Sequence, residues 1–158
     1  IDAVRSYAPG FIFTTALPPP VAAAATTAIR HLKTSSVERD GQQRAVARAR
    51  ARLAECQLPV MDTPTHILPV MIGDAEKCKA ASDRLLEHHN IYIQPINYPT
   101  VPKGTERLRI TPTPLHDDAA IEHLCQALVE TWNHLGLPLG EVEALPEGPA
   151  SLFVSSGG

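Results

Sequence analysis

Residues 97–112 read Asn-Tyr-Pro-Thr-Val-Pro-Lys-Gly-Thr-Glu-Arg-Leu-Arg-Ile-Thr-Pro, and this stretch decides the fold. Its first half contains two prolines and a glycine, which predicts a rigid loop ending at Gly104. Its second half alternates polar and apolar side chains from Arg107 to Ile110, which predicts a strand with Arg107 and Arg109 on one face. Because binding residues often lie on loops held by a rigid scaffold, this stretch is also the first candidate for a site.

On either side of this strand, the periodicity and the turn residues predict several helices and two more strands. The prolines from Pro18 to Pro20 suit the first turn of a helix, Asp74 and Asp117 or Asp118 suit N-caps, and Pro69 favours an edge strand. We expect helices over residues 1–7, 21–33, 35–56, 75–89 and 118–134, and strands over 66–72, 91–93 and 107–110. This order predicts an α+β fold, a small, mainly antiparallel sheet with helices packed on it.

Two of the predicted helices carry expectations about burial. The helix over residues 21–33 is rich in alanine and has few polar side chains, so we expect it to be well buried. In the helix over residues 35–56, four of the five arginines form a basic stripe flanked by acidic residues, which favours a solvated face. These arginines are Arg44, Arg48, Arg50 and Arg52.

The composition is that of a globular protein, because 44% of the 158 residues are hydrophobic and 20% are charged. The net charge of −3 argues against nucleic-acid binding driven by bulk electrostatics. No apolar run approaches the roughly eighteen residues that a membrane-spanning helix requires, so no membrane segment is predicted. The chain starts at Ile1 with what resembles the end of an element, and we expect it to be a piece of a longer polypeptide.

The cysteines and histidines carry no metal or disulfide pattern. Cys56, Cys78 and Cys125 have no CxxC spacing, and we expect them to be small buried hydrophobic residues in a reducing compartment. The seven histidines lack the spacing of metal ligands, so no metal site is expected.

The two arginines of the predicted strand allow two interpretations. An arginine fixed on a strand is a good carboxylate receptor, because its planar guanidinium can bind two oxygens at once. Alternatively, each arginine forms a surface ion pair with Glu106 or Asp117.

Two long motifs resemble those of the α-oxoamine synthases, a family of pyridoxal-phosphate (PLP) enzymes that condense an amino acid with an acyl-CoA. They are residues 6–19, Ser-Tyr-Ala-Pro-Gly-Phe-Ile-Phe-Thr-Thr-Ala-Leu-Pro-Pro, and residues 97–114. The resemblance covers about residues 1–137 and implies the C-terminal part of a type I, aspartate-aminotransferase-like fold. It places the end of a large domain at about 1–35, a small domain at about 36–137 and an irregular tail at 138–158.

The resemblance also implies roles for four residues. Thr14 and Thr15 match a hydroxyl pair that reaches the PLP phosphate bound by the other subunit of a homodimer. Thr100 matches the residue that contacts the carboxylate end of a succinyl group, and Arg109 matches the arginine that holds the carboxylate of glycine. The Schiff-base lysine of the family is expected upstream of this chain, so no catalytic residue is expected within it.

Within the family, the motifs most resemble the members that condense glycine with succinyl-CoA and release CoA and CO2 in tetrapyrrole (haem) biosynthesis. Such a transferase is cytoplasmic in bacteria and lies in the mitochondrial matrix in eukaryotes. Two alternatives stay open. One is a related synthase, such as 8-amino-7-oxononanoate synthase or 2-amino-3-ketobutyrate CoA ligase, and the other is a non-catalytic dimerisation domain.

Overall fold

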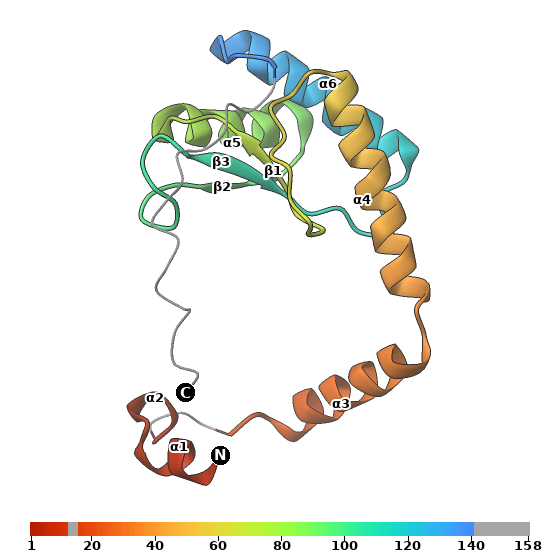
Figure 1. The fold of residues 1–158 in the computed structure, drawn as a ribbon, viewed down its shortest axis with the longest axis vertical. Coiled ribbons are helices and arrows are strands. Elements are labelled where there is room, and N and C mark those ends of the chain that lie inside the picture. The colour runs from red at the N-terminus through yellow and green to blue at the C-terminus, as the bar shows by residue number, and fades with distance from the viewer. Residues whose placement is uncertain (13–15, 141–158) are drawn as a thin grey trace, which may run out of the picture. The chain divides into compact units, whose positions relative to one another are not determined.

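The structure is a computed structural model that describes residues 1–12 and 16–140. The chain divides into two compact units, Ile1–Val37 and Glu38–Gly158, and each is described separately. Figure 1 shows the order of their helices and strands.

The first unit contains three helices in its described residues. They are α1 (Asp2–Tyr7), α2 (Pro9–Ile12) and α3 (Pro19–Thr34). Pro19 and Pro20 open α3, as predicted, because a proline in the first turn lacks only an amide hydrogen that has no partner within the helix. The expectation that this helix is well buried is wrong for the chain alone, since α3 has no buried residue. An alanine-rich face needs a neighbouring surface for its burial, and the described part of this unit supplies none to α3.

The second unit is an α+β layer, as predicted. It consists of α4 (Val37–Glu55), β1 (Leu68–Met71), α5 (Ala75–His89), β2 (Gln94–Ile96), β3 (Arg107–Ile110) and α6 (Asp118–Leu135). The sheet is antiparallel throughout and its order is β1-β3-β2, so β3 is central and β1, with Pro69, lies at an edge. Helix α5 packs against β2, β3 and α6 (Figure 1).

The register of the sheet follows from the alternation in β3. Leu68 pairs with Ile110 and Val70 with Leu108, and the side chains of all four residues are buried. They join one hydrophobic cluster with side chains from the three helices of this unit, including the fully buried Leu53, Leu85, Leu128 and Trp132. Arg107 and Arg109 lie on the opposite face of β3, as the period of two requires.

The two acidic caps are confirmed. The Asp74 side chain accepts a hydrogen bond of 2.8 Å from the amide of Lys77, and the Asp117 side chain accepts one of 2.8 Å from the amide of Ala120. Each carboxylate satisfies an amide that has no partner within its helix, and it also interacts favourably with the helix dipole.

One strand is displaced from its predicted place. Residues 91–93 are not a strand, and pairing with β3 begins at Gln94. The chain leaves α5 through Asn90 in the left-handed conformation, and the carbonyl of Ile93 accepts a hydrogen bond from the buried Ser82 hydroxyl at 2.6 Å. The apolar residues at 91–93 therefore belong to a segment that packs on α5, and they do not form a strand.

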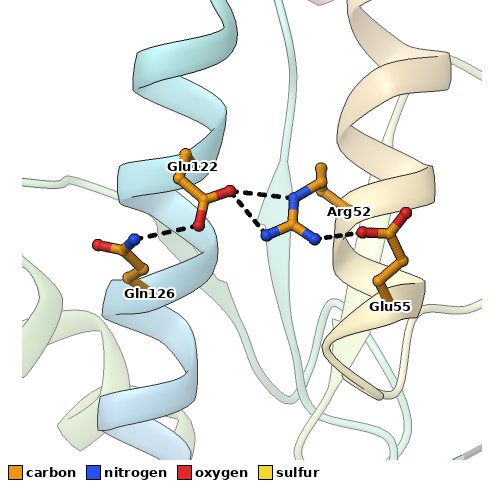
Figure 2. A network of polar contacts seen from close by, with 4 residues as sticks. All are labelled: Arg52, Glu55, Glu122 and Gln126. Atoms are coloured by element: carbon orange, nitrogen blue, oxygen red, sulfur yellow. Dashed lines mark hydrogen bonds and ion pairs between the residues drawn. The ribbon is translucent and has the colours of Figure 1, made fainter.

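The arginine-rich face of α4 is partly exposed, and it also pairs with α6. Arg48 lies 3.0 Å from Asp118, and Arg52 donates from Nε and from a terminal nitrogen to one carboxylate oxygen of Glu122, at 3.0 and 2.7 Å. Arg52 also contacts Glu55, and Glu122 accepts from the Gln126 amide (Figure 2). This network ties α4 to α6 at a distance of about seventy residues along the chain.

The network predicts a pH dependence. The hydrogen bond from Arg52 lowers the pKa of Glu122 below its ordinary value of 4.5. A lowered pKa in the folded state stabilises the protein above the unfolded-state pKa, and this contribution disappears as the pH falls through the folded-state pKa. In the full-length protein, we expect Glu122→Gln to lower the thermal unfolding midpoint at pH 7, and the difference from wild type to shrink as the pH falls below the ordinary glutamate pKa and through the lowered folded-state pKa. Glu87→Gln, which neutralises an exposed carboxylate on α5, is the control. A difference that persists unchanged at pH 3 would contradict the assignment.

Candidate functional site

The predicted loop is present, and it joins β2 to β3. Its main chain turns through hydrogen bonds from the Thr100 amide to the Asn97 carbonyl, at 3.0 Å, and from the Thr105 amide and hydroxyl to the Pro102 carbonyl, at 3.1 and 2.7 Å. The Asn97 side-chain amide donates to the Ala75 carbonyl at the start of α5, at 3.3 Å. The loop is therefore held by its own turns and by a neighbouring helix.

Arg107 and Arg109 share a face but have different surroundings. Nε of Arg107 donates to the Thr105 carbonyl at 2.8 Å, and one of its terminal nitrogens lies 3.1 Å from the sulfur of Met61. Burial lowers the pKa of the Arg107 guanidinium. Arg107 is thus occupied within the fold, which agrees with a structural role.

Arg109 is exposed and available. Among residues 1–12 and 16–140, no ion pair or hydrogen bond engages its guanidinium, so the pairing with Glu106 or Asp117 that the sequence left open does not occur there. Its main chain is fixed on both sides, because Arg109 lies opposite Pro69 of β1 and Gln94 of β2. A fixed strand therefore carries a cation that is free to bind an anionic group.

A cavity of about 350 Å³ adjoins Arg109. It lies between the segment before β2, the residues that follow β3 and the first half of α6, and it is lined largely by apolar side chains. His116 and His123 are polar residues on its wall, and sequence reasoning missed both. His123 Nε2 lies 3.0 Å from the His89 carbonyl, and His116 Nδ1 accepts a hydrogen bond from the Thr113 amide at 2.9 Å. Their positions follow from tertiary contacts, which no spacing in the sequence revealed.

The other predicted site residues stand differently. Thr100 is exposed on the loop. Thr14 and Thr15 lie outside the described residues, five and four residues, respectively, before the start of α3 in the sequence. The structure therefore brings Thr100 and Arg109 into one loop-and-strand segment and leaves the threonine pair as a prediction.

Two other kinds of feature bear on function, metal-binding clusters and membrane-spanning helices. Residues 1–12 and 16–140 contain no group of three histidine, cysteine or acidic side chains that could hold a metal ion. The same residues contain no helix that is long and apolar enough to cross a membrane.

The comparisons with known proteins agree with the fold. The family model "Aminotransferase class I and II" matches residues 1–128. A 5-aminolevulinate synthase of Bradyrhizobium diazoefficiens is 68% identical over 139 residues, which are 88% of this chain and 34% of that protein. A mitochondrial 5-aminolevulinate synthase of Schizosaccharomyces pombe is 56% identical over 133 residues, which are 84% of this chain and 23% of that protein.

Solved structures give the same result. A structure of serine palmitoyltransferase (SPT) with PLP matches with a TM-score of 0.74 and 28% identity, and the match covers 85% of this chain and 34% of that one. An 8-amino-7-oxononanoate synthase from Francisella tularensis, at 19% identity and a TM-score of 0.66, shares the fold. The predicted type I PLP-enzyme fold is thus confirmed. The chain spans about a third or less of the length of these curated relatives.

The cysteines give a testable prediction. Burial raises the pKa of both Cys78 and Cys125 to about 11. At pH 8, only about one thiol in a thousand is then ionised, and the thiolate is the reactive form. We expect iodoacetamide to modify both residues very slowly in the folded full-length protein, and all three cysteines of this chain rapidly in urea. Peptide mapping by mass spectrometry measures the modification, and rapid labelling of Cys78 in the folded protein would contradict its burial.

Proposed function

The chain belongs to the aminotransferase class I and II family, and we propose that it is the C-terminal part of a 5-aminolevulinate synthase. The full-length protein would be an acyltransferase that condenses glycine with succinyl-CoA and yields 5-aminolevulinate, CoA and CO2. The observation that carries this proposal is Arg109, an exposed guanidinium without a partner among the described residues, held on a central strand beside a rigid loop. High identity to proteins named 5-aminolevulinate synthase supports it.

The role of Arg109 is to bind and orient. A guanidinium offers two parallel N–H groups to a carboxylate, which fixes both the position and the rotation of glycine. Held in this way, glycine would keep its α C–H bond in one fixed direction, which is the contribution that Arg109 would make to removal of the α-proton. The pairing of β3 on both sides keeps the arginine in place, and the anchored Arg107 stiffens the same strand.

The cofactor of this proposal is PLP, which supplies an electron sink for the charge that develops on the glycine α-carbon. The described residues fit such a reaction at the substrate end, where Arg109 supplies a carboxylate receptor. Thr14 and Thr15 would donate hydroxyl hydrogen bonds to the cofactor phosphate, close to the N-terminus of α3, where the helix dipole favours an anion. Thr100 would bind the carboxylate end of the succinyl group. In this proposal, the lysine that carries the cofactor would come from a part of the full-length protein outside these 158 residues.

We propose a homodimer in which the threonine pair of one subunit serves the cofactor bound by the other. The end of the large domain would occupy residues 1–35, the small domain 36–137 and an irregular tail 138–158. The named relatives include bacterial and mitochondrial proteins, so the proposed place of action is the bacterial cytoplasm or the mitochondrial matrix. Sedimentation of the full-length protein tests the dimer, and an active monomer would overturn it.

Product assays separate this proposal from its alternatives. The full-length protein with PLP should form 5-aminolevulinate from glycine and succinyl-CoA. A related α-oxoamine synthase would prefer a different amino acid or a different acyl-CoA, such as alanine or acetyl-CoA. A non-catalytic dimerisation domain would form no product and would bind no PLP.

Arg109 gives the sharpest test of the proposal. Arg109→Leu removes the charge and both hydrogen bonds. We therefore expect kcat/KM for glycine to fall more than a hundredfold, which corresponds to a loss of about 3 kcal/mol in transition-state stabilisation. Arg109→Lys keeps the charge without the two-pronged geometry and should lose less. Steady-state kinetics of the full-length protein measure both, with the KM for succinyl-CoA as the internal control.

Arg107→Leu is the matched comparison on the same strand face. Because Arg107 is occupied by Thr105 and Met61, we expect it to change glycine kinetics much less than Arg109→Leu. If Arg107→Leu is the inactive variant and Arg109→Leu is near normal, the wrong arginine has been placed in the site.

The threonine pair gives an independent test. Full-length protein with both Thr14→Ala and Thr15→Ala should bind PLP more weakly, because each lost hydrogen bond to a charged group costs about 1.5–3 kcal/mol. Titration of apoprotein with PLP, followed by absorbance, gives the dissociation constants. Equal constants for wild type and the double variant would mean that the threonines only precede the helix.

A further inference from the structure

Glu106 is a charged residue in a position that the strand pattern assigns to the core. It directly precedes β3 and falls on the same side of the alternation as Leu108 and Ile110, and it is only 3% exposed. A carboxylate in such surroundings costs free energy unless hydrogen-bond donors satisfy it. The burial of Glu106 therefore requires a partner.

The partner is the main chain of the loop. Glu106 Oε2 accepts a hydrogen bond of 2.9 Å from the amide of Gly104. Gly104 has a φ of +84°, in the region that favours glycine, so it is the residue at which the loop reverses toward β3. The carboxylate thus holds this reversal by a charge-assisted hydrogen bond, which is stronger than one between neutral groups.

The main chain of Glu106 joins the loop to a second turn. Its carbonyl accepts hydrogen bonds from the amides of Ile72 and Gly73, each at 2.9 Å, in the turn between β1 and α5. The two turns lie against each other, because a Cβ atom on Gly73 would stand 3.3 Å from the Gly104 carbonyl oxygen. At the other end of the loop, Asn97 is bonded to Ala75 of α5.

We infer that Glu106 is a positioning residue, whose buried carboxylate fixes the loop of residues 97–105 and thereby sets the affinity for the acyl-CoA substrate. This inference rests on the proposed function, in which Thr100 on the same loop meets the succinyl carboxylate. Arg109 lies beyond Glu106 on the paired strand, where β1 and β2 hold it independently of the loop. Loss of the Glu106 carboxylate therefore affects the acyl-CoA and spares glycine.

The test uses the full-length protein with PLP and two measurements on Glu106→Ala. Hydrogen exchange followed by mass spectrometry should show exchange at residues 97–105 faster by about tenfold, which corresponds to one hydrogen bond to a charged group. The KM for succinyl-CoA should rise by about tenfold, while the KM for glycine changes less than about threefold. Exchange in α6 should stay the same.

Two further variants control the result. Glu106→Gln keeps an oxygen that can accept the Gly104 hydrogen bond, so its succinyl-CoA KM should recover to within about threefold of wild type. Glu87→Ala removes an exposed carboxylate from α5 and should change neither measurement. If Glu106→Ala does not fold, Glu106→Asp replaces it, because its shorter side chain keeps the charge but draws it away from Gly104. Glu106→Asp should change both measurements in the same direction.

Several outcomes would overturn the inference. Unchanged loop exchange in Glu106→Ala, or in Glu106→Asp where that variant is used, would show that the carboxylate does not fix the loop. Equal increases in the two KM values would show a general structural role. If wild type forms no product from glycine and succinyl-CoA, the proposed function fails by itself, and with it the link from the loop to the acyl-CoA. Loop exchange then decides whether Glu106 fixes the loop.

Discussion

The alternation of side chains along β3 is the constraint on which the rest of the second unit depends. Leu108 and Ile110 enter the core, and they set the register with β1 on one side and β2 on the other. A shift of one residue would bury Arg107 and Arg109 and expose both apolar side chains, so the register is strongly specified. The same alternation presents the two arginines on the opposite face. A single local pattern thus produces both the packing and the candidate site.

Features with a local cause could be predicted from the sequence. The caps at Asp74 and Asp117 depend on a side chain and an amide three residues apart, so composition and spacing suffice. The strand expected at residues 91–93 is absent because an apolar pattern does not say what it packs on, and here the Ser82 hydroxyl of α5 donates to the Ile93 carbonyl. The prediction that α3 is buried was wrong for a related reason, since burial requires a neighbouring surface that no pattern within the helix can supply.

The candidate site shows the same division. The period of two could place Arg107 and Arg109 on one face, but it could not say which of them is free. Tertiary contacts make that distinction, because Met61 and Thr105 occupy Arg107 and leave Arg109 exposed. Sequence reasoning also passed over Glu106, although its signal was present: a glutamate stands where the alternation calls for an apolar residue. A polar residue at a core position needs a partner, and here that partner is the Gly104 amide.

A binding group that orients a substrate must itself be held rigidly, because it cannot fix the orientation of the substrate if it moves with it. Arg109 meets this requirement through main-chain pairing on both sides, which leaves its side chain as the only adjustable element. The loop has no such pairing. Asn97 attaches it to α5, and Glu106 attaches it to the turn between β1 and α5. In the proposed reaction, the strand would therefore suit the small and constant amino-acid carboxylate, whereas the loop, attached at fewer points, would suit the longer acyl group. Selection among acyl groups would then depend on the contacts that hold the loop, and selection for the amino acid on the sheet.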